Sequence, residues 1–569
     1  MAGEYCGFLF PCRPGRTAAP HGATRIRLSR FFMIADANAP ASRAGSLLLP
    51  ILISVALAIF LMTLMPTTMF WDRDEAFYAR AAVEMIQSGN WILPTYNDDI
   101  FPDKPPLIYW LMAVFMHVFG QNEFAARFVS APATAGSAFL IFLIGSRLFD
   151  RRAGLWSMLV FASSTLTIYL GITAMLDATL VFTICLALWA FLAIMQDRDG
   201  FWIKAGVFLV AMSLALLTKG PVGPAIVVPA VAITWFFTRR GERPPFWQMF
   251  VLAVATFIGV GIFLLWAIPA NTMSHGEMLQ SGVGEHIIGR ALKPMQGHGA
   301  SGWLGYLAFL PVYIPVLVIG FMPATLFLPA ALSAVSRSTG SKGTPSPRLF
   351  ILSWMVPGFV MFSLAATKLP HYIEPMIPAF SLAAGGVIAG RLKAGNGALR
   401  FGRWLYIVQI AGLAAALLAV VALAPAAWLK ITLVVVALGC IGFAFRISLL
   451  HRLGQFESAM RVGLVSVILL MESMFLFVIP AIEKDIKLSK PVAELLRKEF
   501  KPGTPVFEAD YLEPSLVFYL GWPVDTPIRE IKEDDAGRRA FLASAGEHAV
   551  VATREQYDAL KALDTTGRL

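Results

Sequence analysis

The residues best suited to chemistry lie in one polar interval, residues 71–127, between two apolar runs. Its first stretch has helical periodicity from about Asp72 to Gly89, with Asp74 and Glu75 in the first turn. A carboxylate held beside apolar segments can act as a general base on a hydroxyl or amine. Capping of the helix N-terminus explains one or two such acids equally well, so both interpretations stay open.

Lys104 precedes Pro105 and Pro106, which fit the first turn of a second short helix because a missing N–H does no harm there. The free N–H groups of that turn, its positive dipole end and an ammonium would together hold a phosphate. A lysine whose head group reaches back to the interface is the plain alternative. Asp103, the neighbour of Lys104, could bind a metal or cap the helix.

Other charged residues recur at the ends of apolar runs. Asp177 lies at the mouth of one run, where an acid is costly to bury and usually functional, although a helix cap is the alternative. Lys219 and Lys368 each lie at the end of a run and could balance the charge of a phosphate, or simply extend to the interface. The segment 271–302 adds three candidates: Glu285, His286 and Arg290. His286 could be a metal ligand or an ordinary loop histidine.

The elements that must position these residues are apolar helices. Only 14% of the 569 residues are charged, and the mean hydropathy is +0.68. Apolar runs of about 18 or more residues recur along the chain, which predicts a polytopic α-helical membrane protein with about thirteen spans. The predicted spans are 46–66, 127–146, 155–169, 177–195, 202–217, 221–237, 247–269, 308–332, 349–366, 372–390, 405–424, 428–446 and 462–481.

The distribution of basic residues predicts the orientation of these spans. Lysine and arginine collect in the N-terminal tail and in alternate loops: 147–152, 198–204, 239–243, 337–348, 391–403 and 446–461. By the positive-inside rule these loops are cytoplasmic, and the net charge of +10 needs no nucleic acid to explain it. The other side then carries 71–127, Asp177, Lys219, 271–302 and the turn Lys368–Tyr372. All the candidate residues are therefore expected on one exterior face.

Composition divides the chain into three parts. Residues 1–45 are poorly patterned and are expected to form a disordered cytoplasmic tail, while 46–481 form the transmembrane domain. Residues 482–569 mix charged and apolar positions, which predicts a small exterior α/β domain. The sequence has neither a Walker motif nor a glycine-rich turn after a strand, so we expect no nucleotide cofactor. The four cysteines indicate neither a disulfide framework nor a metal cluster.

A series of motifs then follows in order: D-E-x-x-Y-A-x-x-A-x-E-M-x-x-x-G-x-W-x-x-P, K-P-P-L-x-Y-W, L-T-K-G-P and K-L-P-H-Y-x-x-P. They comprise Asp74–Glu75, Tyr78, Glu84–Met85, Gly89, Trp91, Pro94, Lys104–Leu107, Tyr109–Trp110, Leu217–Pro221 and Lys368–Pro375. From about residue 50 to 390 the chain resembles the bacterial aminoarabinose transferase and protein mannosyltransferase-like group. These are integral-membrane glycosyltransferases of the GT-C fold in the bacterial inner membrane.

The resemblance implies a sugar donor linked to a polyprenyl phosphate such as undecaprenyl phosphate, and an acceptor that is a lipid A-like glycolipid or a protein. It implies that Asp74 and Asp177 are the acids of the site, with Glu75 and Glu285 in support. Donor-phosphate contacts are implied for the following residues: Lys104, Tyr78, Tyr372, Lys219, Arg290 and Lys368.

Relatives bind a divalent metal ion through an acid before the K-P-P lysine and a later histidine, here Asp103 and His286. The chain departs from the family pattern at Asp103, where a glutamate is usual. It also departs at Ala76–Phe77, where many relatives carry proline and arginine. These departures bear on metal binding and on the identity of the acceptor.

The expected reaction is an inverting sugar transfer. The acceptor is oriented by Asp74 and Asp177, and basic side chains neutralise the departing lipid phosphate. A transporter or flippase for the lipid-linked sugar is the main alternative, although transporters tend to have internal repeats and charges at mid-membrane. A non-catalytic envelope scaffold is a further alternative. It would not need Asp74, Asp177 and Lys104 on one face.

Overall fold

The structure is a computed structural model that describes residues 43–70, 73–289, 302–337, 345–424, 426–511, 513–531, 534–543 and 546–564. The chain divides into two units, Met1–Ser46 and Leu47–Leu569, and the following description concerns the second. The predicted disordered tail lies almost entirely outside the described residues, as does Arg290. The side chains of Glu285 and His286 lie outside them as well, so the roles predicted for these residues stay predictions.

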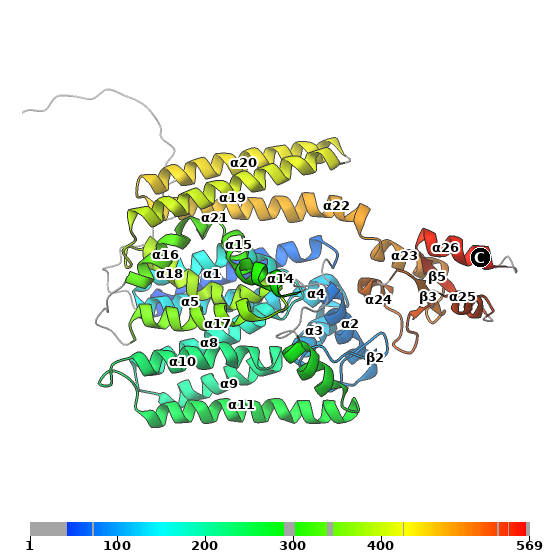
Figure 1. Cartoon of the computed structure of the whole chain (residues 1–569), viewed down its shortest axis with the longest axis horizontal. Helices are drawn as coiled ribbons and strands as arrows, with labels where there is room; N and C mark the ends of the chain where they lie inside the picture. Colours follow the sequence, from blue (N-terminus) through cyan, green and yellow to red (C-terminus); the bar gives the residue numbers. More distant parts are fainter. Residues whose placement is uncertain are drawn as a thin grey trace, which may run out of the picture. The chain divides into compact units, whose positions relative to one another are not determined.

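Apolar helices make up most of the second unit, as the hydropathy pattern predicts (Figure 1). The helices of the bundle are α1 (Arg43–Leu64), α5 (Ser130–Leu148), α6 (Arg151–Ser163), α7 (Thr165–Gly171), α8 (Asp177–Gln196), α9 (Phe201–Lys219), α10 (Val222–Phe237), α11 (Phe246–Met273), α14 (Gly302–Phe309), α15 (Tyr313–Gly320), α16 (Leu328–Arg337), α17 (Pro347–Leu364), α18 (Ile377–Ile388), α19 (Asn396–Leu423), α20 (Ala427–Arg452), α21 (Phe456–Ser473) and α22 (Ile479–Ile486). Shorter turns connect them: η2 (Met65–Thr67), α12 (Glu277–Leu279), η3 (Gln280–Gly289), η4 (Leu310–Val312), η5 (Ala324–Phe327), η6 (Pro370–Met376) and η7 (Met474–Val478).

Ten helical segments among the described residues are long and apolar enough to cross a membrane, or eleven if the pair α6 and α7, bent by 65°, is one span. The chain is therefore a multi-pass membrane protein. The predicted span 155–169 corresponds to this bent pair. The predicted span 221–237 corresponds to the 16-residue helix α10, and the predicted span 372–390 corresponds to η6 followed by α18. These three elements account for the larger number of spans expected from the sequence.

The centre of the bundle is α8, which packs against α5 and α9. In the most apolar stretch of α8, 83% of the residues are buried inside the protein, whereas 22% are buried in the corresponding stretch of α11. A helix that is apolar all round belongs in such a centre, whereas α11, α19 and α20 keep apolar side chains on the outside, where lipid would cover them. Close approach is possible where glycine lies at a helix contact: a Cβ on Gly385 of α18 would lie 2.5 Å from the backbone nitrogen of Ser157.

The polar interval folds into α2 (Arg73–Ser88), a hairpin of β1 (Thr95–Tyr96) and β2 (Asp99–Ile100), α3 (Leu107–Phe119) and α4 (Glu123–Arg127). Both predicted helices are present, although the second begins at Leu107, after the two prolines. The hairpin was not predicted. Asn97 and Asp98 form its two-residue turn with φ of 56° and 69°, the conformation that asparagine and aspartate tolerate best after glycine.

The last part of the chain contains a small parallel sheet with helices (Figure 1). Its elements are α23 (Ser489–Glu499), β3 (Val506–Ala509), α24 (Pro514–Leu520), β4 (Arg529–Glu530), α25 (Asp535–Leu542), β5 (Ala549–Ala552) and α26 (Arg554–Leu563). The strand order is β4-β3-β5, with Phe507 opposite both Arg529 and Val550. We call residues 489–564 the C-terminal segment. Strands followed by helices are the pattern expected here from the mixed composition.

Candidate active site

The first turn of α2 is held in place by a buried ion pair. Glu75 accepts hydrogen bonds from Nε and Nη2 of Arg127, at 2.9 and 3.0 Å, and from the backbone N–H of Ala174 at 2.7 Å. The other guanidinium hydrogens go to the carbonyl oxygens of Met65, Thr68 and Met69. The start of α2 is thereby fixed to η2, to α4 and to the residues just before α8. Asp74, the residue before Glu75 on the helix, is positioned by the same contacts.

A second group surrounds Asp103. The Tyr78 hydroxyl donates to Oδ2 of Asp103 at 3.1 Å, and Nζ of Lys104 lies 2.7 Å from Oδ1. Burial raises the pKa of Tyr78 well above its ordinary value, and the nearby charges of Asp103 and Asp74 raise it further. Tyr78 is therefore protonated at neutral pH and acts as a hydrogen-bond donor. Asp74 is close enough to act on this tyrosine electrostatically.

A third group forms around Asp177, the first residue of α8. Asp177 is 1% exposed, and its Oδ1 lies 2.7 Å from Nζ of Lys219, the last residue of α9. Nε2 of His371 lies 4.0 Å from its Oδ2, and the Lys219 ammonium lies 5.0 Å from the centre of the Tyr372 ring. The motifs L-T-K-G-P and K-L-P-H-Y therefore meet at one buried carboxylate.

These groups belong to one electrostatic cluster. Lys104 is close enough to Asp177 to stabilise its negative charge, and Asp74 acts on Tyr78 beside Asp103. Each lysine already faces an acid at 2.7 Å. An ammonium has three donor hydrogens, so each lysine can hold its carboxylate and still donate to a phosphate oxygen. The arrangement can hold an anion, and its acids can orient a hydroxyl or amine.

Lys368 is engaged elsewhere. Its ammonium donates to the carbonyl oxygens of Ser363 and Ala365, each at 2.6 Å, at the C-terminal end of α17. It also lies over the rings of Tyr306 and Tyr313, at 5.7 and 5.9 Å. Burial lowers the pKa of Lys368. These contacts describe a helix cap, and the phosphate contact expected of Lys368 stays a prediction.

Several buried charged residues were not among the predicted site residues. Arg127 ends α4 in an apolar context, and Glu374 lies inside the K-L-P-H-Y-I-E-P motif, where it accepts from the Thr167 hydroxyl at 2.8 Å and acts electrostatically on Asp177. Glu84, part of the first motif, is fully buried. Each was visible as a charged residue among apolar neighbours. The partners of Arg127 and Glu374 are distant in sequence, whereas those of Glu84 lie 4 to 14 residues away. Glu75, expected as support for the acceptor, is enclosed by Arg127 and supports the site by positioning α2.

The described residues do not by themselves form a metal site. No group of three or more histidine, cysteine, aspartate or glutamate side chains suited to a metal ion occurs in the described ranges. Both oxygens of Asp103 already accept hydrogen bonds, from Lys104 and Tyr78. A divalent ion would have to replace at least one of these partners.

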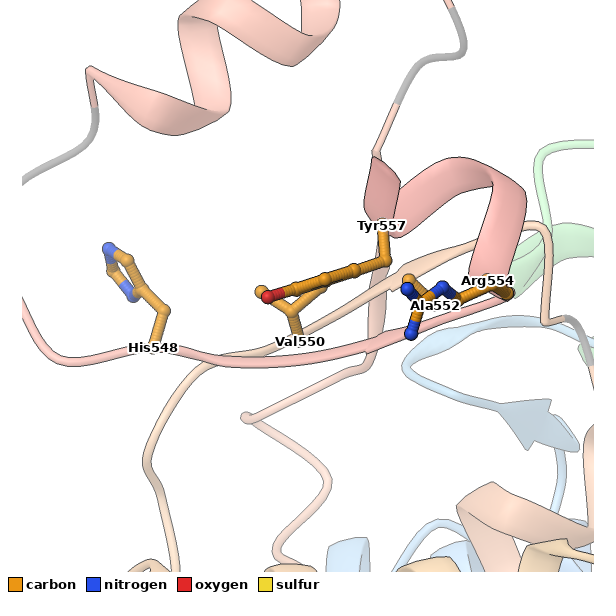
Figure 2. A pocket seen from close by; sticks show the side chains of 5 residues that line it. All are labelled: His548, Val550, Ala552, Arg554 and Tyr557. Atoms are coloured by element: carbon orange, nitrogen blue, oxygen red, sulfur yellow. The ribbon is translucent and has the colours of Figure 1, made fainter. Parts of the chain in front are cut away.

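A separate hollow of about 490 Å³ lies on the C-terminal segment (Figure 2). His548, Val550 and Ala552 come from the β5 strand region, and Arg554 and Tyr557 come from α26. Alternate residues of a strand point to the same face, which explains why 548, 550 and 552 line it together. None of the acids and lysines of the cluster lines this hollow.

Comparison with known proteins identifies similar chains. Residues 103–266 match the family model described as dolichyl-phosphate-mannose-protein mannosyltransferase. The undecaprenyl phosphate-α-4-amino-4-deoxy-L-arabinose arabinosyl transferase of Shewanella sediminis is 33% identical over 325 residues, 56% of either chain. The transferase of the same name from Edwardsiella ictaluri is 30% identical over 381 residues, 64% of either chain. The chain thus spans between 56% and 64% of the length of these two curated relatives.

Solved structures show the fold. ArnT from Cupriavidus metallidurans, bound to undecaprenyl phosphate, superimposes with a TM-score of 0.70 at 21% identity, covering 92% of this chain and 95% of that one. The same protein in the apo state gives a TM-score of 0.68. The GT-C fold class predicted from the motifs is confirmed. The predicted resemblance to the aminoarabinose transferase and mannosyltransferase-like group is confirmed as well.

Proposed function

We propose that this chain is a membrane glycosyltransferase that moves a sugar from a polyprenyl-phosphate donor to an acceptor of the cell envelope. The observation that carries the proposal is the cluster in which Asp74, Tyr78 and Asp103–Lys104 of the polar interval lie near the buried pair Asp177–Lys219. The similarity to undecaprenyl phosphate-dependent arabinosyl transferases supports the same donor class. No observation on the described residues favours a transporter or flippase.

Lys104 and Lys219 bind the donor phosphate in this proposal. Each ammonium keeps its carboxylate partner, at 2.7 Å, and also donates to a phosphate oxygen. As the glycosidic C–O bond breaks, its electron pair goes to the phosphate oxygen, and the two ammonium groups stabilise that negative charge. The single hydrogen of the Tyr78 hydroxyl is donated to Asp103, so Tyr78 holds that carboxylate beside Lys104 and can donate to the phosphate only by leaving it. The ring of Tyr372 lies 5.0 Å from the Lys219 ammonium and stabilises its charge.

Asp74 acts as the general base toward the acceptor. It would take the proton from the acceptor hydroxyl or amine as the new bond to the anomeric carbon forms, while the lipid phosphate leaves from the opposite face. This geometry inverts the configuration at the anomeric carbon. Asp177, which is buried and paired, would contribute to orientation and to the charge balance around the lysines. The transferred sugar is a pentose or a hexose.

The proposed location is the bacterial inner membrane. The positive-inside distribution of lysine and arginine supports a cytoplasmic N-terminus, with the cluster and the C-terminal segment on the periplasmic side. In that orientation a lipid-linked sugar reaches the cluster laterally from the bilayer. A lipid A-like glycolipid would reach it from the same leaflet, and a protein is the second acceptor class.

A divalent ion at Asp103 and His286 is a separate part of the proposal, and no step of the reaction is assigned to it. The metal content of purified protein, measured by inductively coupled plasma mass spectrometry before and after dialysis against a chelator, tests it. About one equivalent of metal per wild-type protein chain, with a lower metal content in Asp103→Ala and in His286→Ala, would support the site. Equal metal content in wild type and both variants would refute it.

The decisive experiment uses purified protein in detergent, radiolabelled undecaprenyl-phosphate sugars and an envelope-lipid extract, with products separated by thin-layer chromatography. We expect label to move to a glycolipid with wild type. Removal of the base in Asp74→Asn should slow transfer by about 10²- to 10⁴-fold. Asp99→Asn is the matched control, because Asp99 is an exposed acid of the same polar interval. If the wild-type protein leaves the label on every donor that is tried, the result would contradict the proposed activity.

A further inference from the structure

Phe70, the last described residue before α2, is 2% exposed and so has almost no contact with water. Its backbone N–H donates to the Tyr519 hydroxyl at 2.9 Å, and its carbonyl oxygen accepts from Nζ of Lys487. A buried backbone group that loses such a partner cannot turn to water instead. Both backbone groups of Phe70 are therefore held by residues that follow it by 449 and 417 positions.

The ring of Phe70 is held by the same part of the chain. It lies edge-to-face with the ring of Phe518 at 4.8 Å and stacks on the ring of Tyr519 at 5.9 Å, both between ring centroids. Aromatic pairs prefer defined relative orientations, so these contacts fix the orientation of Phe70 as well as its position. Phe518 and Tyr519 lie on α24 of the C-terminal segment, and Lys487 lies just before that segment. We call Lys487, Phe518 and Tyr519 the clamp.

The clamp is connected to the turn that carries Asp74. The Arg127 guanidinium lies 5.3 Å from the centre of the Phe70 ring and donates to the carbonyl oxygen of Met69 at 2.9 Å. The same guanidinium pairs with Glu75, the neighbour of Asp74 in the first turn of α2. Phe70 also precedes Asp74 by only four residues. A displacement of Phe70 would therefore reach Asp74 along the chain and through Arg127.

The C-terminal segment has further contacts with α2 and with the hairpin that follows it, away from Asp74. Nη1 of Arg80 donates to the carbonyl oxygen of Trp522 at 3.2 Å. The Asn97 side chain donates to the carbonyl oxygen of Ile528 and accepts from its N–H, both at 2.9 Å. These contacts by themselves attach the segment to α2. The clamp adds a separate attachment at the start of α2, where the position of Asp74 is set.

We infer that the clamp positions Asp74 for proton transfer, so that the C-terminal segment supports the reaction without contributing a reacting group. The inference rests on the proposed function, in which Asp74 is the general base. A base must lie within hydrogen-bond reach of the proton that it removes. A displacement of about 1 Å can slow a reaction about 10²-fold, even when its cause lies far from the chemistry. Lys487 and Tyr519 are therefore positioning residues.

Tyr519→Phe keeps the ring of the clamp and removes only the hydroxyl that accepts from Phe70. With donor and acceptor saturating, we expect it to lower kcat roughly 10-fold, because the base is displaced. The KM for the donor should be unchanged, because the lysines proposed to bind the phosphate are untouched. Tyr511→Phe is the matched control, since the Tyr511 hydroxyl lies 3.4 Å from that of Ser489, inside the C-terminal segment. A kcat for Tyr519→Phe equal to that of the control would overturn the inference.

The second contact of the clamp is tested in the same assay. Lys487→Met removes the ammonium that donates to the Phe70 carbonyl, and we expect a similar fall in kcat with an unchanged KM for the donor. Lys484→Met is the matched control, because Lys484 is an exposed lysine of α22. Equal kcat values for Lys487→Met and Lys484→Met would count against the inference.

A double-variant cycle separates positioning of the base from a general loss of structure. If the clamp acts through Asp74, then Tyr519→Phe should cost little further rate in the Asp74→Asn background, where no base is left to position. The residual transfer by Asp74→Asn and by the double variant measures this difference. The same fold loss from Tyr519→Phe in both backgrounds would show a purely structural effect and would refute the inference.

Hydrogen exchange separates this inference from the proposed function, because it requires no turnover. The amides of Phe77–Arg80 are the first in α2 with acceptors inside the helix. We expect them to exchange faster in Tyr519→Phe than in wild type or Tyr511→Phe, with α5 unchanged. Unchanged exchange in α2 would overturn the clamp whether or not the protein transfers label. Faster exchange, together with a wild type that transfers no label, would support the clamp and count against the proposed reaction alone.

Discussion

Glu75 and Arg127 form a two-pronged ion pair that is closed off from solvent. Two N–H groups of the guanidinium reach the two carboxylate oxygens at 2.9 and 3.0 Å, with side-chain exposures of 2% for Arg127 and 0% for Glu75. Remaining guanidinium hydrogens are taken by backbone carbonyls, and the carboxylate also accepts from Ala174. This pair fixes the turn that carries Asp74, so the geometry of the proposed base depends on a residue that ends α4.

Removing one side of this pair should destabilise the protein strongly. Arg127→Leu leaves the Glu75 carboxylate buried without its counter-charge, and we expect a loss of about 3–5 kcal/mol in the free energy of unfolding. Arg152→Leu is the control, because Arg152 is 51% exposed in its pair with Glu457, and an exposed pair contributes about 0–1 kcal/mol. Denaturant unfolding in detergent measures both. Equal losses in the two variants would show that burial does not set the strength of the Glu75–Arg127 pair.

Asp177 and Lys219 should behave as one unit in transfer. Lys219→Met leaves Asp177, at 1% exposure, without its ammonium partner, and we expect transfer to fall by at least about 10²-fold as leaving-group stabilisation is lost. Since the residues are coupled, Asp177→Asn combined with Lys219→Met should be little worse than either alone. Lys204→Met, at the other end of α9, is the matched control. Fully additive losses in the double variant would contradict the coupling.

The pair Asp103–Lys104 offers a test of phosphate binding that also bears on metal. Asp103→Asn removes a negative charge 2.7 Å from the lysine, so the donor phosphate meets less repulsion and the KM for the donor should fall several-fold. Lys104→Met should raise the KM for the donor. Initial rates at varied donor concentration, with and without chelator, measure both effects. If Asp103→Asn and the chelator each abolish transfer, the carboxylate serves a metal ion instead of restraining Lys104.

Stability of the C-terminal segment should depend on pH through Glu508. Burial raises the pKa of Glu508 to about 7, and the opposite Glu530 on β4 adds to the shift. This folded-state pKa lies above the ordinary glutamate value near 4.3. Between about pH 4.3 and pH 7 the folded segment therefore binds more protons at Glu508 than the unfolded segment does. Stability should therefore fall as pH rises toward 7 and stay low above it.

Glu508→Gln should remove most of that pH dependence and stabilise the segment at pH 8. Hydrogen exchange of residues 506–552, corrected for the intrinsic exchange rate, measures protection at pH 5.5 and pH 8. Glu555→Gln on α26 is the control, because Glu555 is exposed and should leave the profile unchanged. Protection that rises with pH in wild type would have the wrong sign for a buried acid and would contradict the assignment.

The sequence by itself determined the class of the protein and predicted which residues form its candidate site. Apolar runs that are long enough to cross the hydrocarbon core of a membrane predict spanning helices, however those helices pack. The fold comparison confirms the predicted fold class. Motif spacing placed Asp74, Tyr78, Lys104, Asp177 and Lys219 among the candidates, and the structure brings these five together. Exact span boundaries were harder to predict, because α6 and α7 bend by 65° and α10 is shorter than a full span.

Only the tertiary structure decided which charged residue meets which. Glu75 and Arg127 are 52 residues apart, and Asp177 and Lys219 are 42 residues apart, so no local pattern links them. The attachment of Asn97 to Ile528 joins residues separated by 431 positions. Hydropathy and helical periodicity are local properties of a chain. Pairing of buried charges is settled by helix packing, because a charge taken out of water must find its partner wherever the packed helices place one.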